Sequence, residues 1–266
     1  MNAPQAVAEP ILLQSRSADG VVTLTLNRPA QFNSLSRDML TALQEALDAI
    51  AADPSARVVV LAGAGKAFCA GHDLKEMRAN PAREFQQALF DQCSRMMLTL
   101  TRMPQPVIAR VHGIATAAGC QLVSMCDLAV AASEARFAVS GVNLGLFCST
   151  PSVGLVRNLN RKAAMEMLLT GGFISAEEAR VRGLVNRVVP VAELDASIGE
   201  LAAAIVAKTP VAIRMGKEMF YRQIDMGLEQ AYAYAGQVMA DNMMTCDAQE
   251  GIDAFIAKRA PNWQGR

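Results

Sequence analysis

The chain has 266 residues, of which 52% are apolar and 19% are charged, so it can bury a packed core and is not an intrinsically disordered chain. Its 25 basic and 25 acidic residues cancel, which excludes the basic surplus of a general nucleic-acid binder but leaves room for a local basic pocket that takes a small anion. The length favours one large domain, or one domain with an appendage.

In the amino-terminal half, the hydrophobic pattern alternates between strand and helix. Residues 21–26 alternate apolar and polar β-formers, as a half-buried strand does, and a helix that Ser36 caps follows them. Residues 57–61 and 107–111 are short, nearly all-apolar runs, typical of strands covered on both faces, and residues 84–102 between them have helical composition. The order strand, helix, strand, helix, strand predicts an α/β fold with a layered sheet.

Beyond residue 112 the predicted elements are shorter. Ser175 and Glu178 form a capping-box pattern that predicts the start of a helix, and Gly183 predicts its end. The other predicted elements are a helix at residues 121–125 and strands at residues 128–131, 136–139 and 184–189.

The carboxyl-terminal part is predicted to be helical. Apolar residues recur at helical spacing over residues 194–205 and again over residues 228–239. The composition changes from mixed to helical near residue 190. We therefore expect a core of residues 1–190 and a helical region of residues 191–266.

The cysteines and histidines form no metal-binding pattern. The 6 cysteines include no C-x-x-C pair, and the 2 histidines, His72 and His112, stand far apart in sequence, so we expect no metal site. Residues 1–20 lack the basic-then-apolar pattern of a secretion signal, which predicts reduced cysteines in a cytoplasmic protein. The long uncharged run at residues 137–156 contains a proline, serines and several glycines, which favours a buried loop region over a membrane helix.

Two segments of small residues each follow a predicted buried strand, at residues 68–74 and 112–121. Small side chains let a ligand approach the main chain closely, and free amide groups at a strand end or a helix start bind developing negative charge. Two such amides that converge on one oxygen form an oxyanion hole, the strongest electrostatic device in acyl chemistry. The alternative is that the small residues only permit tight packing of strand against helix.

The two segments belong to a series of motifs that covers nearly the whole chain. The series consists of residues 26–29 with 33–35, 58–61, 66–75, 112–122, 126–127, 170–171 with 176–183, and 250–252 with Phe255, Lys258 and Arg259. Motifs of these types in this order resemble the crotonase, or enoyl-CoA hydratase/isomerase, superfamily. The resemblance implies a spiral of β-β-α units and a helical carboxyl-terminal trimerisation region. It also implies a homotrimer or a dimer of trimers.

The resemblance further implies a coenzyme A thioester as the ligand, with coenzyme A entering as part of the substrate and no separate cofactor. The oxyanion amides are then the backbone N–H groups of His72 and Ala118. By the same resemblance, the carbonyl group of Ala70 faces the adenine. The core of residues 1–190 thus holds the coenzyme A and oxyanion site, and residues 191–266 hold the subunits together.

Four more residues are placed around coenzyme A by the same resemblance. Arg28 and Lys66 lie near its phosphates, and Phe255 and Lys258 reach the coenzyme A of a neighbouring subunit. The alternative is that these side chains are ordinary surface groups.

The sequence departs from the family at the two positions where the hydratases that it resembles carry glutamates. A Gly-Gly-Gly-Cys-Glu-Leu pattern is replaced here by a segment with Gln121, and a Pro-Glu pattern by one with Gly141. Glutamine cannot cycle a proton and glycine has no side chain. Because general acid–base help contributes about 10² to 10⁴ in rate, we expect classical hydratase activity to be weak.

Few other residues are candidates to replace the glutamates. The side chain of His72 has the pKa best suited to proton transfer. Residues 148–150 lie in a loop that we expect to border the acyl pocket, but the cysteine there has no evident partner base. We expect Asp73 and Asp127 to orient loops and cap helix starts, and Asn143 to be able to hold a water molecule.

Three functions remain open. The first is an enoyl-CoA hydratase/isomerase-like enzyme, of the lyase or isomerase class, that acts on a thioester through an oxyanion hole. The second is a non-catalytic acyl-CoA binder or a partner of related enzymes, and the third is a structural protein with an emptied site. Residues 141–151 resemble the branch of the family called enoyl-CoA hydratase domain-containing protein 3, which shares the missing glutamates and whose reaction is poorly defined.

Overall fold

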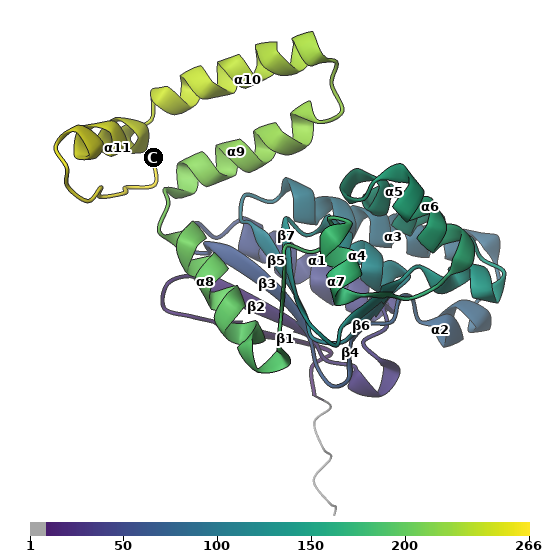
Figure 1. Cartoon of the computed structure of the whole chain (residues 1–266). Coiled ribbons are helices and arrows are strands. Elements are labelled where there is room, and N and C mark those ends of the chain that lie inside the picture. The colour runs from purple at the N-terminus through teal and green to yellow at the C-terminus, as the bar shows by residue number, and fades with distance from the viewer. Residues whose placement is uncertain (1–8) are drawn as a thin grey trace, which may run out of the picture.

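Within residues 9–266, which the computed structural model describes, the strands form two sheets at the centre of the molecule (Figure 1). The strands are β1 (Leu12–Arg16), β2 (Val21–Leu26), β3 (Val58–Gly63), β4 (Ala67–Cys69), β5 (Val107–Val111), β6 (Ile114–Thr116), β7 (Leu128–Ala132), β8 (Arg136–Ala138), β9 (Ile174–Ser175) and β10 (Arg187–Val189). The larger sheet has the order β1-β2-β3-β5-β7-β10 and is parallel except for the β1–β2 pair. The smaller sheet has the order β4-β6-β8-β9 and is parallel except for the β8–β9 pair.

From β3 to β8, consecutive strands alternate between the two sheets. β3 and β4, β5 and β6, and β7 and β8 each place one strand in the larger sheet and the next in the smaller, and helices follow. This repeated β-β-α path confirms the predicted α/β fold. The helices are α1 (Arg37–Ala51), α2 (Leu74–Ala79), α3 (Arg83–Arg102), α4 (Ala118–Met125), α5 (Ser149–Asn158), α6 (Arg161–Thr170), α7 (Ala176–Val181), α8 (Leu194–Val206), α9 (Pro210–Gln223), α10 (Leu228–Met243) and α11 (Cys246–Ile256), with short 3₁₀ helices η1 (Pro29–Gln31), η2 (Ser140–Leu144) and η3 (Val191–Glu193).

One face of the larger sheet is covered by α1 and α3. The hydroxyl group of Ser36 accepts a hydrogen bond from the backbone N–H of Met39, as an N-cap does, and so begins α1 where the sequence predicts it. The buried faces of both helices repeat at helical spacing and pack with the inward side chains of the strands. The residues that α1 and α3 bury are Met39, Leu40, Leu43, Leu47, Ile50, Leu89, Cys93, Met96, Met97 and Leu100.

The opposite face of the same sheet is covered by α8 (Figure 1). Alternate residues of β3, such as Val58 and Val60, point to this side and pack with Leu194 and Ile198 of α8. The all-apolar run of β3 is therefore covered on both faces, as predicted. α8 therefore packs on the sheet although it follows residue 190, where the composition of the chain changes.

Most predicted bounds agree with the structure to within one or two residues, but one helix and one strand begin further from their predicted positions. The helix predicted from residue 121 begins at Ala118, because a backbone turn at Ala117 that the sequence does not announce starts it early. The last strand covers only Arg187–Val189, because the N–H of Leu184 bonds back to the carbonyl group of Ala179 and closes a turn after α7. The capping box of Ser175 and Glu178 is confirmed.

The helices α9 and α10 form a hairpin that stands off the rest of the chain, and α11 follows it (Figure 1). Asp127 ties the middle and the last turn of α9 to the core. Its carboxylate accepts hydrogen bonds from the ammonium group of Lys217 at 2.6 Å, the hydroxyl group of Tyr221 at 2.9 Å and the N–H of Val107 at 2.7 Å. The prediction that Asp127 caps a helix is therefore wrong, since its carboxylate ties a distant helix to a strand instead. Asp73 does cap a helix, α2, by accepting from the N–H groups of Lys75 and Glu76.

The long uncharged run at residues 137–156 divides among β8, η2 and α5 instead of forming one helix. Among the described helices, none is by itself long and apolar enough to cross a membrane, and one pair bent by 102°, Val191–Val206 with Pro210–Gln223, reaches that length and composition together. The prediction about a secretion signal concerns residues 1–20, of which 1–8 lie outside the described residues.

Candidate active site

The two segments of small residues meet at one edge of the smaller sheet. They leave β4 and β6, which are parallel neighbours, so both segments emerge on the same side. Gly71 in the first segment has a φ of +94°, and a Cβ atom placed on it would lie 2.9 Å from the Cβ of Ala117 and 3.3 Å from the backbone nitrogen of Ala118. The approach is this close only because residue 71 has no side chain.

Ala117 has a strained backbone at this meeting point. Its φ of 51° and ψ of −120° lie in a region that residues with a side chain rarely adopt. The N–H of Ala117 donates to the carbonyl group of Ala138 at 3.0 Å, which helps to hold the turn. This conformation directs the chain straight into α4, so that Ala118 is the first residue of the helix and its N–H is the first N–H group.

The backbone N–H groups of His72 and Ala118 have no hydrogen-bond acceptor within residues 9–266. The neighbouring N–H groups of Ala70 and Asp73 are bonded, to the carbonyl groups of Phe32 at 3.0 Å and Leu35 at 3.3 Å. Ala118 is only 1% exposed, and a buried N–H without an acceptor is rare in proteins. Two free donors in adjoining segments are the arrangement that an oxyanion hole requires.

Both residues line one cavity of about 720 Å³, which we call the α4 cavity. Its size falls in the range of about 300–1,000 Å³ that is usual for small-molecule sites. No carboxylate side chain of the described residues lines it. The apolar side chains that line it come from α2, α3 and the loop after η2, and include Leu74, Met77, Phe90, Leu144, Leu146 and Phe147.

His72 is held in the wall of the α4 cavity as a neutral imidazole. Burial lowers its pKa below the ordinary value of 6.5, and a hydrogen bond from its Nδ1 to the carbonyl group of Leu35, at 3.4 Å, opposes that shift only in part. Its ring packs edge-on against Phe90 with the centroids 5.4 Å apart. Its Nε2 atom is buried and has no partner among the described residues.

Gln121 lies one turn after Ala118 on α4 and is 4% exposed. Its Oε1 atom has no hydrogen-bond partner in the described part of the chain, although a buried amide oxygen normally has one. Gln121 does not itself line the α4 cavity. A buried amide without a partner at this place is a group that bound water or ligand can satisfy.

Gly141 does line the α4 cavity, and its surroundings leave no room for a side chain. A Cβ atom on it would lie 2.5 Å from the carbonyl oxygen of Leu146 and 2.7 Å from the sulfur of Cys148. The loop is held there because the N–H of Gly141 donates to that sulfur at 3.2 Å and its carbonyl group accepts from the N–H of Leu146 at 2.9 Å. The loop therefore occupies the space that a side chain at position 141 would need.

Cys148 lines the cavity as a neutral thiol. Burial raises its pKa, and the hydrogen bond from Gly141 offsets only part of that rise. A thiol in this state is a weak nucleophile. Residues 148–150 line the cavity as predicted, but Ser149 and Thr150 belong to the first turn of α5 and not to a loop.

Sequence reasoning missed three polar side chains of the cavity, those of Gln86, Ser140 and Arg78. Ser140 lines it, and its hydroxyl group lies 2.9 Å from that of Thr116 at the end of β6. Arg78, in the last turn of α2, also lines it. The only signal was position, since Ser140 stands next to Gly141 and Arg78 stands shortly after residues 68–74.

Comparison with known proteins identifies the family. A family model described as "Enoyl-CoA hydratase/isomerase" matches residues 16–266. The chain belongs to this family. The human protein named "Enoyl-CoA hydratase domain-containing protein 3, mitochondrial" is 43% identical over 96% of this chain and 84% of its own length. An Escherichia coli protein named "2,3-dehydroadipyl-CoA hydratase" is 34% identical over 92% of this chain and 96% of its own.

Solved structures of the family share the fold. A crystal structure titled enoyl-CoA hydratase from Mycobacterium smegmatis has a TM-score of 0.95 at 62% identity, covering 96% of this chain and 99% of that one. The human domain-containing protein 3 has a TM-score of 0.93 at 43% identity, covering 96% and 100%. The crotonase-like fold and the resemblance to that branch are thus confirmed.

The structure brings only some of the residues that the family resemblance assigns into one place. Ala70 lines the α4 cavity beside His72, Ala118 and Gly141. Arg28 does not, and its guanidinium group donates to the carbonyl group of Ser34 at 3.0 Å and to the carboxylate of Asp73 at 2.9 Å. Its role at the phosphates stays a prediction.

Lys66, Phe255 and Lys258 also lie outside the α4 cavity. Lys66 is exposed, and Phe255 is 85% exposed at the end of α11. Figure 1 places α11 on the opposite side of the molecule from α2, so within one chain these last two residues do not approach the cavity. Among the described residues, no group of three or more histidine, cysteine, aspartate or glutamate side chains could hold a metal ion.

Proposed function

We propose that this protein binds an acyl-CoA in the α4 cavity and acts on its thioester. The observation that carries the proposal is the pair of free N–H groups at His72 and Ala118 beside an apolar cavity. Such donors stabilise the negative charge that develops on a thioester oxygen, and removal of one donor costs about 10² to 10³ in rate in well-studied enzymes.

This site supports enoyl-CoA hydratase/isomerase-like chemistry. The backbone N–H groups of His72 and Ala118 polarise the thioester carbonyl group, and no carboxylate takes part. Hydration of a conjugated thioester needs a group that takes and gives a proton. Gln121 and Gly141 cannot, so we expect classical hydration to be weak. His72 is the group placed to move a proton, because its neutral imidazole is in the cavity wall. The name of the E. coli relative supports a CoA thioester as substrate.

The exposed hairpin supports a trimeric assembly as part of the same proposal. Large apolar side chains remain exposed along α9, α10 and α11, where a second copy of the chain would cover them. In that assembly Phe255 and Lys258 reach the coenzyme A of the neighbour, which a single chain does not allow. The exposed apolar side chains are Phe220, Ile224, Leu228, Tyr232, Met239, Met243, Met244, Ile252, Phe255 and Ile256.

Infrared difference spectroscopy tests the oxyanion hole directly. We expect the stretching frequency of a ¹³C-labelled crotonyl-CoA carbonyl group to fall on binding, because two N–H donors polarise it. Gly71→Ala should weaken binding at least tenfold and abolish the shift, since the new Cβ meets Ala117 and the nitrogen of Ala118. Gly183→Ala is the matched control, because Gly183 also has a positive φ of 91° but lies outside the cavity. Tight binding with an unshifted carbonyl band would contradict the proposal.

A non-catalytic acyl-CoA binder is the second candidate, favoured by the absence of a carboxylate from the cavity lining within residues 9–266. A product screen over saturated, enoyl and 3-oxoacyl thioesters separates the two. Product that disappears in His72→Ala supports the enzyme, and tight binding with no product from any thioester supports the binder.

A further inference from the structure

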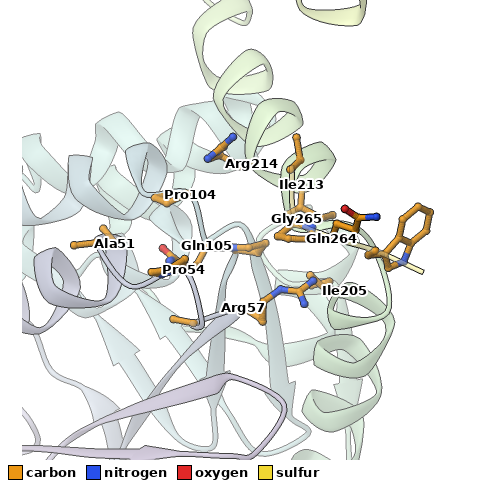
Figure 2. A pocket seen from close by; sticks show the side chains of 16 residues that line it. Ala51, Pro54, Arg57, Pro104, Gln105, Ile205, Ile213, Arg214, Gln264 and Gly265 are labelled. Carbon is orange, nitrogen blue, oxygen red and sulfur yellow. The ribbon is translucent and has the colours of Figure 1, made fainter. Parts of the chain in front are cut away.

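A second cavity, of about 660 Å³, lies between the core and the root of α9 (Figure 2). We call it the α9 cavity. Its walls come from four parts of the chain: residues 51–57, residues 104–106, residues 205–214 and the tail at residues 263–265. It shares no residue with the α4 cavity.

The α9 cavity lies at the other ends of the strands. Arg57 and Pro106 directly precede β3 and β5, at the amino ends of these parallel strands. The α4 cavity is built where β4 and β6 end. The two cavities are therefore separate sites with separate walls.

The charged side chains that line the α9 cavity are Arg57 and Arg214, and none of the described residues supplies a carboxylate to the lining. Figure 2 shows Arg214 on α9 in the upper part of the view and Arg57 below it. Arg214 has no hydrogen bond or ion pair with any described residue. The Nη2 atom of Arg57 donates to the carbonyl groups of Val206 at 3.1 Å and Lys208 at 2.7 Å. The guanidinium group of Arg57 has no acidic partner among the described residues. Two uncompensated guanidinium groups around one cavity favour an anion.

Gln105 adds a buried acceptor without a donor. The residue is 5% exposed, and its Nε2 donates to the carbonyl groups of Ile50 at 2.8 Å and Asp53 at 3.2 Å. Its Oε1 atom has no hydrogen-bond partner in the described part of the chain. An N–H or O–H group on a ligand would satisfy it.

Apart from Gln264, the remaining walls are apolar and stiff. Four prolines line the cavity, which fixes the backbone around it. Trp263 lines it as well, and its indole N–H donates to the carbonyl group of Ala207 at 2.9 Å, so the ring is held in place. A flat apolar or aromatic body fits such walls better than a hydrated inorganic ion does. The prolines are Pro54, Pro104, Pro106 and Pro210.

We propose that the α9 cavity binds an organic anion that carries an N–H or O–H donor on an apolar, aromatic body. The guanidinium groups of Arg57 and Arg214 pair with the anionic group, and the amide oxygen of Gln105 accepts from the donor. Because the walls include both the core and the first turns of α9, the bound molecule also stabilises the packing of α9 on the core.

The test uses the full-length protein and a matched pair of probes. The first probe is 8-anilinonaphthalene-1-sulfonate, which has an anionic sulfonate, an N–H donor and aromatic rings. The second is N-phenyl-1-naphthylamine, which keeps the rings and the N–H but has no charge. Trp263 is the single tryptophan of the chain, so quenching of its emission reports occupancy of the cavity wall. We expect the sulfonate to quench Trp263 and to raise the melting temperature, and to bind at least tenfold more tightly than the neutral probe.

Variants locate the binding. Arg214→Gln should weaken binding of the sulfonate at least tenfold and leave the neutral probe unchanged, and Arg214→Lys should restore part of the affinity. Arg78→Gln is the matched control, because it removes a cation from the α4 cavity instead. Equal affinity for the two probes, an unchanged affinity in Arg214→Gln, or displacement of the sulfonate by saturating butyryl-CoA would each overturn the proposal. Acyl-CoA binding, measured separately, should not respond to Arg214→Gln.

Discussion

The α4 cavity and the contact of Asp127 with α9 both bury polar groups, but the groups differ in their hydrogen-bond partners. The carboxylate of Asp127 is partnered on both oxygens, since it meets Lys217, Tyr221 and a backbone N–H. In the α4 cavity the groups are neutral and lack partners, as at the N–H of Ala118 and the Nε2 of His72. Buried polar groups whose hydrogen bonds are all made within the protein thus stabilise the fold, whereas equally buried groups without a partner are candidates to bind a ligand.

Breaking the ion pair between Asp127 and Lys217 of α9 should have the largest effect. Lys217→Met leaves the buried carboxylate of Asp127 without its cation, and loss of one partner of a buried pair typically costs about 3–5 kcal/mol. Urea unfolding measures the loss. Tyr221→Phe is the control, because it removes one hydrogen bond from the same carboxylate and should cost about 1 kcal/mol. If Lys217→Met lowers the free energy of unfolding no more than Tyr221→Phe does, then the ion pair of Lys217 and Asp127 is not what holds α9 to the core.

Much of the fold was predictable because its strands and helices are defined by local patterns. The all-apolar run of β3 predicts a strand covered on both faces, and the spacing of apolar residues in α1 predicts its buried face. Elements with weaker patterns, including the edge strand β1 and the short helix α2, were not predicted. Their positions depend on packing with distant parts of the chain, which a single sequence does not display.

The backbone part of the site was also predictable, whereas its side-chain surroundings were not. The family resemblance places the oxyanion N–H groups at residues 72 and 118, and the structure brings Gly71 close to Ala118. That the two N–H groups bind one oxygen stays a prediction. The loop that fills the space beside Gly141, and the role of Asp127 at α9, arise from residues that are distant in sequence or joined by irregular loops. No periodicity marks such contacts.

A glutamate introduced at position 141 tests whether the α4 cavity has room for the carboxylate that it lacks. Gly141→Glu forces its Cβ against the carbonyl oxygen of Leu146 and the sulfur of Cys148, and overpacking of this kind costs about 1–3 kcal/mol. We therefore expect lower stability and no gain in crotonyl-CoA hydration. Gln121→Glu is the companion variant, because it adds a carboxylate on α4 without adding bulk. A stable Gly141→Glu protein that hydrates crotonyl-CoA faster than the wild type would contradict this account of the loop.

The smallest expected effect is a pH dependence that arises from neutral, buried His72. Its native pKa lies below the ordinary value of 6.5, so the unfolded chain binds a proton first as the pH falls. Stability is then complete above about pH 6.5 and is lost as the pH falls through the lowered native pKa. His112, the other histidine, shifts in the same direction because it is also partly buried.

Urea unfolding between pH 7 and pH 5 isolates this effect, because unperturbed carboxylates titrate mostly below that window. The difference in stability between the two ends should shrink in His72→Gln and persist in part in His112→Gln, which keeps the imidazole of the α4 cavity. If His72→Gln keeps the full pH dependence, then the pKa of His72 is the same in the native and the unfolded protein. In that case the imidazole in the wall of the α4 cavity takes up a proton as readily as it does in water, and the description of this wall as lined by neutral, unpartnered groups fails at His72.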